Sequence, residues 1–173
     1  MKELSVNDIP LLLKKRERIS HKGTYGTVNA VVGSEKYRGA AVLALMGALR
    51  SGVGIARVCS VEKVCAAAVA HYPSAVLLPL EDENGGISAS AADGVISTLK
   101  PTDALLIGCG LGCVAGTVSA VNRLIFTFKG KMVIDADGLN ALTVSGALAE
   151  AERSCALNGC VVTPHFGEMS RLC

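Results

Sequence analysis

Short, continuous apolar runs that alternate with longer helical segments are the feature that most constrains the fold of this chain. Strand-like runs are predicted at residues 27–32, 55–59, 75–80, 104–107, 132–134 and 160–163. Continuous rather than alternating apolar runs are typical of strands that are covered on both faces. Regular alternation with helices predicts a parallel sheet with right-handed crossovers. We therefore expect a three-layer α/β fold, with a mainly parallel sheet and helices on both faces, in a single domain over residues 1–173.

The segments between these runs are predicted to be helical. They cover residues 5–16, 39–51, 61–71, 88–99 with Ser88 or Ser90 as cap, 114–127, and 137–150 as one helix or two. Gly52 follows the second of them, where a left-handed cap is expected. That helix is apolar almost all round, which indicates burial on two sides, either within one domain or against another subunit. Residues 81–86 are expected to form a polar surface loop.

Composition excludes several classes of partner. A formal net charge of +2 provides no electrostatic basis for binding nucleic acid or an anionic membrane. The longest apolar stretch, residues 40–49, is far shorter than the roughly 20 residues that span a bilayer, and the first residues do not resemble a targeting segment. The seven cysteines are odd in number and include no Cys-x-x-Cys pair, so we expect reduced thiols and no metal site. The chain is expected to be soluble and cytoplasmic.

Ligands of parallel sheets bind at the carboxyl ends of the strands. The predicted strands end at Gly33-Ser34, Gly108–Gly112, Asp135–Gly138 and Thr163–Glu168. Each of these loops taken alone is an ordinary turn. Four loops rich in glycine or polar residues at one edge of the sheet suggest a ligand site there.

Individual residues in these loops suggest particular chemistry. The Gly-x-Gly-x-Gly run at 108–112 would let backbone amides approach a phosphate or carbonyl, although it is not the dinucleotide fingerprint. Asp135 and Asp137 could hold Mg²⁺ through water, orient a ribose or cap a helix; we expect Asp137 to cap and leave Asp135 open. His165 follows a proline at a strand end, so it should be partly exposed and able to donate a hydrogen bond.

Six motifs in order carry a family resemblance. They are Lys22-Gly23-Thr24-Tyr25-Gly26, Gly33-Ser34 with Tyr37-Arg38-Gly39-Ala40-Ala41, Ala48-Leu49-Arg50-Ser51-Gly52, Ile107 to Gly112, Val133 to Asn140, and Thr163-Pro164-His165-Phe166-Gly167-Glu168. Together, from about His21 to the last residue, the chain closely resembles the ADP/ATP-dependent NAD(P)H-hydrate dehydratase family, a branch of the ribokinase-like fold.

The resemblance implies repair of hydrated nicotinamide nucleotides. A nucleotide, ADP or ATP with Mg²⁺, would phosphorylate the hydroxyl of NAD(P)H hydrate, and loss of phosphate would restore the ring. Carried over by position, it places the substrate near Ala40 or Ala41, near Gly110 and Gly112, and near His165. Asp135, Asn140 and Glu168 are further possible contacts. Small-molecule nucleotides and a second copy of the chain are the partners that we expect.

One part of the family pattern is absent. The family continues with a Lys-Gly segment and a Gly-Thr-Gly-Asp loop whose aspartate acts as the base, whereas no Gly-Asp dipeptide occurs in this chain. The family's catalytic aspartate would therefore lie beyond Cys173, and the resemblance implies a C-terminally truncated chain that is nearly inactive alone. The alternatives are another ribokinase-like small-molecule kinase, or a non-catalytic binding or assembly module.

Overall fold

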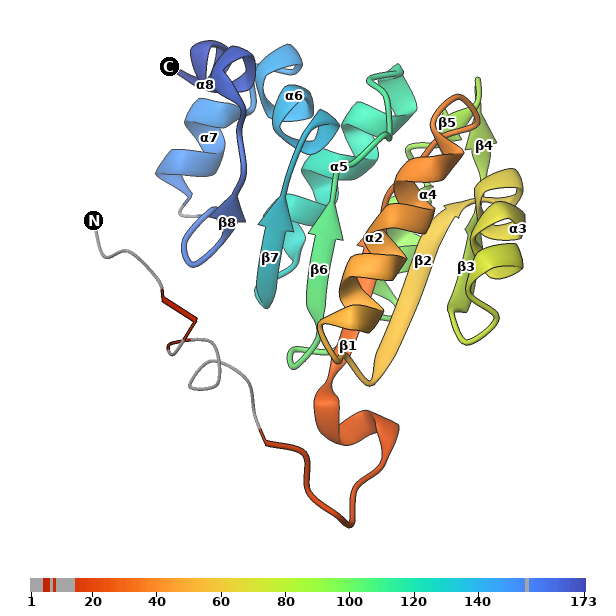
Figure 1. Cartoon of the computed structure of the whole chain (residues 1–173). Coiled ribbons are helices and arrows are strands. Elements are labelled where there is room, and N and C mark those ends of the chain that lie inside the picture. Colours follow the sequence, from red (N-terminus) through yellow and green to blue (C-terminus); the bar gives the residue numbers. More distant parts are fainter. Residues whose placement is uncertain (1–4, 7, 9–14, 155) are drawn as a thin grey trace.

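A six-stranded parallel sheet forms the centre of the computed structural model, which describes residues 5, 6, 8, 15–154 and 156–173 (Figure 1). The helix predicted at residues 5–16 falls largely outside this set. The strands are β1 (Thr27–Val31), β2 (Ile55–Val61), β3 (Val76–Leu80), β6 (Ala104–Ile107), β7 (Lys131–Ile134) and β8 (Val161–Val162). All neighbouring strands of this sheet run parallel. The predicted α/β class and parallel sheet are confirmed.

The order of the strands identifies where a ligand should bind. The sheet runs β3-β2-β1-β6-β7-β8, so the chain builds outward from β1 in one direction and then returns to place β6 on the other side of β1. The connections that follow β1 and β6, which are neighbours in the sheet, therefore lead away from each other in opposite directions. Such a topological switch point opens a crevice at the carboxyl edge of a parallel sheet.

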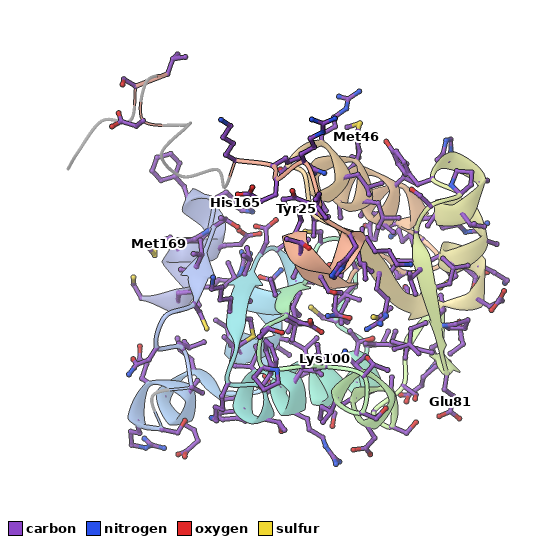
Figure 2. All side chains as sticks on the ribbon, turned by 90° about the horizontal axis from the view of Figure 1, so that it is seen from below. Tyr25, Met46, Glu81, Lys100, His165 and Met169 are labelled. Carbon is purple, nitrogen blue, oxygen red and sulfur yellow. The ribbon has the colours of Figure 1, made fainter. Side chains whose placement is uncertain are left out.

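Helices lie on both faces of the sheet. The longer ones are α2 (Arg38–Arg50), α3 (Glu62–His71), α5 (Ala115–Thr127) and α6 (Asp137–Val144), and the shorter ones are η1 (Lys22–Tyr25), α4 (Ala91–Ile96), α7 (Leu148–Arg153) and α8 (Phe166–Leu172). Figure 2 looks along the strands, with α2 and α3 on one face and α4 and α5 on the other. The predicted segment 137–150 forms two helices. Among the described residues, no helix is both long and apolar enough to cross a membrane.

The segment predicted as a polar loop at 81–86 is instead a small hairpin. β4 (Asp82–Glu83) and β5 (Gly86–Ile87) pair antiparallel around Asn84 and Gly85, both with positive φ (54° and 80°). An Asn-Gly pair with this geometry makes the tight turn that suits a two-residue hairpin. The following helix, α4, is shorter than predicted. Ser90 occupies the N-cap position of α4, one of the two predicted, but the hydroxyls of Ser88 and Ser90 donate to Glu81 and make no cap hydrogen bond to the helix.

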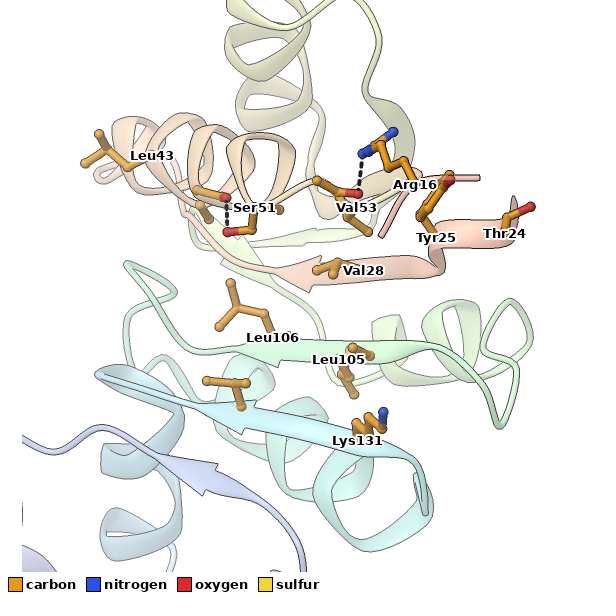
Figure 3. A pocket seen from close by; sticks show the side chains of 16 residues that line it. Arg16, Thr24, Tyr25, Val28, Leu43, Ser51, Val53, Leu105, Leu106 and Lys131 are labelled. Carbon is orange, nitrogen blue, oxygen red and sulfur yellow. Dashed lines mark hydrogen bonds between the residues drawn. The ribbon is translucent and has the colours of Figure 1, made fainter. Parts of the chain in front are cut away.

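The sheet is not covered equally along its width. In β6 and β7, Leu105, Ile107, Met132 and Ile134 are fully buried, whereas Leu106 and Val133 on the opposite face are only partly buried. Figure 3 shows this face, where residues of β1, β6, β7 and α2 line a groove of about 1030 Å³. Leu43 of α2 is 64 % exposed here. Among the described residues, α2 is thus buried on one side only.

A polar cluster interrupts the apolar core in the middle of β1. Asn29 is fully buried and lies in register with Arg57 of β2 and Leu105 of β6. Its Nδ2 donates to Asp103 (3.1 Å), and its Oδ1 accepts a hydrogen bond from Arg57 (2.6 Å). The amide thus links a buried carboxylate to a guanidinium. Buried polar groups require such partners because each unpaired one carries its full desolvation penalty.

Asn29→Ala is expected to lower the free energy of unfolding by about 2–4 kcal/mol, because it leaves both the Asp103 carboxylate and the Arg57 guanidinium short of a buried partner. Urea-induced unfolding followed by circular dichroism measures the change. Asn158→Ala, at an exposed position, is the matched control and should change stability by less than about 0.5 kcal/mol. Equal effects of the two substitutions would contradict the structural role of Asn29.

Candidate functional site

The glycine loop after β6 is interlocked with the start of α6. Gly108 has φ 125°, and a Cβ at this position would collide with the carbonyl oxygen of Asp135. Across the contact, a Cβ on Gly138 would lie 2.9 Å from the carbonyl oxygen of Ile107. Only residues without side chains allow the two loops to approach this closely. The loops after β6 and β7 are therefore fixed relative to one another.

The same loop is joined to the one that follows β1. The Gly33 amide donates to the Cys109 carbonyl, and the Ser34 hydroxyl donates to the Gly110 carbonyl, both at 2.8 Å. A Cβ on Gly110, which has φ 69°, would lie 2.7 Å from the Cβ of Ala40. Predicted site residues Ala40 and Gly110 are thus neighbours. Ala41, by contrast, is fully buried in the core, so only Ala40 of that pair reaches the edge.

The carboxylate of Asp137 extends across the edge instead of capping its helix. Its Oδ2 accepts a hydrogen bond from the Gly112 amide (2.8 Å), and its Oδ1 accepts one from Asn140 (3.2 Å). Asn140 Oδ1 in turn accepts two hydrogen bonds from Arg171 of α8, at 3.1 and 2.9 Å. The prediction that Asp137 caps α6 is wrong, because Ala136 occupies the N-cap position. This chain of contacts connects predicted residues Gly112 and Asn140 to α8.

Asp135 links the ends of three strands. Its carboxylate accepts hydrogen bonds from the Thr163 hydroxyl (2.8 Å) and from the Cys109 thiol (3.5 Å). Burial of Cys109, followed by the negative charge of Asp135, raises the pKa of the thiol to about 11. The thiol therefore stays protonated at neutral pH and is a weak nucleophile. The sequence left the role of Asp135 open. In the structure its carboxylate ties the ends of β6, β7 and β8 together.

His165 and Glu168 form the N-terminal cap of α8. His165 Nδ1 accepts hydrogen bonds from the Gly167 and Glu168 amides (3.0 and 3.4 Å), while the buried Glu168 carboxylate accepts one from the His165 amide (2.9 Å). This is a reciprocal capping box. Because Nδ1 accepts, the ring proton of a neutral imidazole lies on Nε2, which is 3.2 Å from Glu168 Oε1. The side chain remains 69 % exposed, as predicted from the sequence.

A pocket of about 390 Å³ lies beside these loops. It is lined by Ser34, Glu35, Lys36, Tyr37, Asn84, Gly85, Gly86, Leu111, Gly112 and Val114. The lining comes from the loop after β1, the tip of the β4–β5 hairpin and the glycine loop. Pockets that hold small ligands have volumes of roughly 300–1,000 Å³. Of the residues predicted from sequence, Gly112 lines this pocket, and Ala40 and Gly110 adjoin it through Tyr37.

Sequence reasoning missed the contribution of the hairpin and of Tyr37. The Asn84-Gly85 pair was the available signal for a tight turn. No signal indicated that this turn would reach a loop some fifty residues earlier, where the Glu35 amide donates to the Gly85 carbonyl (2.7 Å).

The described residues do not form a metal centre. No group of three or more His, Cys, Asp or Glu side chains lies close enough together among them to hold an ion. Asp135 and Asp137, the carboxylates suggested by the sequence, each accept hydrogen bonds from neighbouring protein groups, and Glu35, which lines the pocket, is bonded to Lys63. Hard cations such as Mg²⁺ need several free oxygen ligands. These residues therefore do not fit a Mg²⁺ site on their own.

Comparison with known proteins gives a consistent result. Residues 28–173 match the family described as NAD(P)H-hydrate dehydratase (Carb_kinase). The chain is 37 % identical over 160 residues to the bifunctional NAD(P)H-hydrate repair enzyme Nnr of Salinibacter ruber, covering 91 % of this chain and 29 % of that protein. The Nnr protein of Thermofilum pendens is 30 % identical over 171 residues, with 98 % and 32 % covered. The chain thus spans about a third of the length of these relatives.

Solved structures agree. A ribokinase-like superfamily protein from Enterococcus faecalis V583 superposes with a TM-score of 0.80 at 21 % identity, covering 98 % of this chain and 55 % of that one. The ADP/ATP-dependent NAD(P)H-hydrate dehydratase from Bacillus subtilis, co-crystallized with ATP/Mg²⁺, gives a TM-score of 0.64 at 28 % identity, with 92 % and 51 % covered. The ribokinase-like fold predicted from the motifs is confirmed.

Backbone strain at the edge generates a testable expectation. Ala136 has φ 48° and ψ −118°, a conformation that residues with a Cβ rarely adopt, between the Asp135 and Asp137 contacts. Ala136→Gly should relieve strain of about 1–3 kcal/mol, partly offset by the greater chain entropy of glycine when unfolded, and so leave the protein equally or more stable. Ala149→Gly, in the ordinary backbone of α7, should destabilise by about 0.5–1 kcal/mol. Thermal melting compares the two; an equal loss in both variants would contradict strain at Ala136.

Proposed function

Since the chain belongs to the NAD(P)H-hydrate dehydratase family, we propose that it takes part in the nucleotide-dependent dehydration of (6S)-NAD(P)H hydrate. In this reaction a phosphoryl group of ADP or ATP is transferred to the hydroxyl at C6 of the hydrated ring. The C6–O bond then breaks, phosphate leaves with the bonding electrons, and loss of a ring proton restores the double bond. Phosphorylation is needed because hydroxide is a poor leaving group and phosphate a good one. Positioning and charge stabilisation carry most of such a transfer.

The observation that supports this proposal most is the set of interlocked loops around the pocket at the switch point. Gly112 lines the pocket with no atom within 4 Å of where a Cβ would stand, so a flat ring can approach its backbone, while Gly110 packs closely on Ala40 and fixes the loop that carries Gly112. His165, on the capping turn of α8, has an exposed imidazole that is oriented by the Gly167 amide at Nδ1 and by Glu168 Oε1, 3.2 Å from Nε2. Each group is fixed by hydrogen bonds before a ligand arrives, which lowers the entropic cost of binding.

The family's catalytic aspartate and its phosphate-binding Gly-Thr-Gly-Asp loop have no counterpart in these 173 residues. The 173 residues contain no Gly-Asp dipeptide. General-base catalysis contributes about 10²–10⁴-fold, and donors that stabilise the transferred group about another 10²–10³-fold. We therefore propose that a polypeptide of these residues binds the hydrated substrate but does not turn it over at a useful rate. ADP or ATP, with Mg²⁺, is proposed as the phosphoryl donor because of the family to which the chain belongs, and no step is assigned to the metal.

A paired activity and binding measurement tests the proposal. The purified chain is incubated with NADH hydrate, Mg²⁺ and either ADP or ATP, and recovery of NADH is followed by its absorbance. The Bacillus subtilis dehydratase serves as the positive control. We expect calorimetric binding of NADH hydrate with turnover reduced at least about 10⁴-fold relative to the control. Turnover similar to the control would contradict the missing base. Binding of hydroxymethylpyrimidine in preference to NADH hydrate would instead favour a vitamin-precursor kinase.

A second candidate function, self-assembly, is favoured by the exposed strand β8. Among the described residues β8 pairs only with β7, and Val161 and Val162 are 56 % and 44 % exposed. An apolar edge strand with unpaired backbone groups is a template for pairing with another chain. This candidate would make the chain a homo-oligomer.

Size-exclusion chromatography coupled to light scattering at a series of concentrations tests self-assembly. We expect the apparent mass to rise with concentration, and Val161→Lys to shift the equilibrium toward the monomer by about 10-fold or more, because an edge lysine opposes strand pairing. Val144→Lys places the same charge at an exposed valine at the end of α6 and is the matched control. A monomer at all concentrations would exclude this candidate.

A further inference from the structure

We infer that Tyr37 and Lys36 recognise the nicotinamide mononucleotide half of the hydrated dinucleotide, with the Tyr37 ring against the nicotinamide and the Lys36 ammonium on the adjacent phosphate. The inference rests on the proposed function and adds two specificity-determining residues to it. Tyr37 lies in one of the family motifs, but neither residue is among the substrate contacts that the resemblance carries over.

The pocket in which these residues lie is lined by three separate segments. The loop after β1 forms one wall, the hairpin tip at Asn84 and Gly85 a second, and the glycine loop with Leu111 the third. A Cβ on Gly86 would press within 2.9 Å of Val114 Cγ2, so the hairpin packs directly on the start of α5. Of the ten lining residues, Tyr37 alone is aromatic. The pocket thus offers a small, firmly built space with one flat side chain.

The backbone of Tyr37 is fixed while its ring is left open. Its amide donates to the Ser34 carbonyl (3.0 Å), and its carbonyl accepts from the Ala40 amide (3.2 Å). Its Cβ lies 3.0 Å from where a Cβ on Gly110 would stand. Yet the residue is 49 % exposed, and its hydroxyl makes no hydrogen bond with any residue that the structure describes. A ring held in this way can stack on a ligand ring with little further loss of entropy.

Among the described residues at the pocket mouth, Lys36 is a cation without a carboxylate partner. Glu35 is hydrogen-bonded to Lys63 and lies 3.9 Å from Arg38, so these three side chains neutralise one another in part. The hydrogen bond from Lys63 and its charge hold the pKa of Glu35 below its usual value. Lys36 forms no ion pair with a described carboxylate; its ammonium lies 5.4 Å from the centroid of the Tyr37 ring. Such an exposed cation–π contact is worth only about 0.5–1 kcal/mol, so a phosphate can displace it.

A flat ring next to a cation suits a ligand that has both a heterocycle and a nearby phosphate. Tyr37 would contact the heterocycle, and its neighbour Lys36 would contact the phosphate. The nicotinamide and the adenine halves of a dinucleotide share this chemistry. We assign the nicotinamide half because Gly112 and Gly110, which the proposed reaction places at the hydrated ring, line or adjoin the same pocket. The alternative is that Tyr37 and Lys36 contact the adenine half, and measuring the binding of ADP tests this alternative.

The experiment measures dissociation constants of the full chain by isothermal titration calorimetry. Probes are NADH hydrate, the hydrates of reduced nicotinamide mononucleotide and riboside, and ADP. Tyr37→Ala should weaken NADH hydrate about 3–10-fold, and Tyr37→Phe should retain affinity because the ring persists. Lys36→Met should weaken the mononucleotide hydrate several-fold but leave the riboside hydrate unchanged, and the difference should shrink in high salt.

Tyr25→Ala is the matched control. Tyr25 also carries a cation over its ring, Arg16 at 4.3 Å from the centroid, but it precedes β1 at the opposite edge of the sheet and lines the larger groove. Its replacement should leave the affinity for NADH hydrate unchanged.

The outcomes separate this inference from the proposed function. If the wild-type chain binds NADH hydrate and Tyr37→Ala binds it equally well, the inference is wrong and the proposed function stands. Two other results would also overturn it. If ADP binding depends on Tyr37, then Tyr37 contacts the adenine half. If Tyr25→Ala loses as much affinity as Tyr37→Ala, then the ligand binds in another pocket. If the wild-type chain binds no hydrate at all, both the inference and the proposed function fall.

Discussion

The close approach of two loops at Gly108 is the contact on which the rest of the carboxyl edge depends. Without a Cβ at Gly108, the Asp135 carbonyl and the start of α6 can pack directly against the end of β6. A side chain there would push α6 outward and break the hydrogen bond from Gly112 to Asp137. That bond begins the series of contacts through Asn140 to Arg171 of α8. One missing methyl group therefore sets the relative positions of β6, α6 and α8.

The acidic residues of this edge act as structural ties, and this shapes its chemistry. Asp135 accepts from Thr163 and Cys109, Asp137 accepts from Gly112 and Asn140, and Glu168 accepts from the His165 amide. Each carboxylate thereby joins loops that follow different strands. Because these hydrogen bonds hold the three carboxylates in place, the loops after β6, β7 and β8 keep their relative positions. The edge is therefore a prearranged surface at the place where we propose that the substrate binds.

The sequence predicted the sheet and most helix positions, because continuous apolar runs bounded by glycines record burial directly. The family motifs also named Ala40 and Gly110, which are neighbours in the structure, while binding of the substrate at Ala40, Gly110, Gly112 and His165 stays a prediction. The sequence did not predict the hairpin at 82–87, because two-residue strands leave almost no pattern. Nor could it separate Ala40 from Ala41, since one step along a helix turns a side chain by about 100° and carries it from edge to core. The capping role of His165 depends on which ring nitrogen accepts, a matter of geometry alone.

Apolar runs also overstated how completely the sheet is covered. Leu106 and Val133 look like core residues in the sequence, but in the described structure they face the groove beside α2. The groove and the pocket share that helix: Leu43 and Ala48 line the groove, and Tyr37, immediately before the first residue of α2, lines the pocket. The segment from Tyr37 to Arg50 thus contributes to both surfaces, with its N-cap residue at the ligand edge and its later turns on the uncovered face of the sheet.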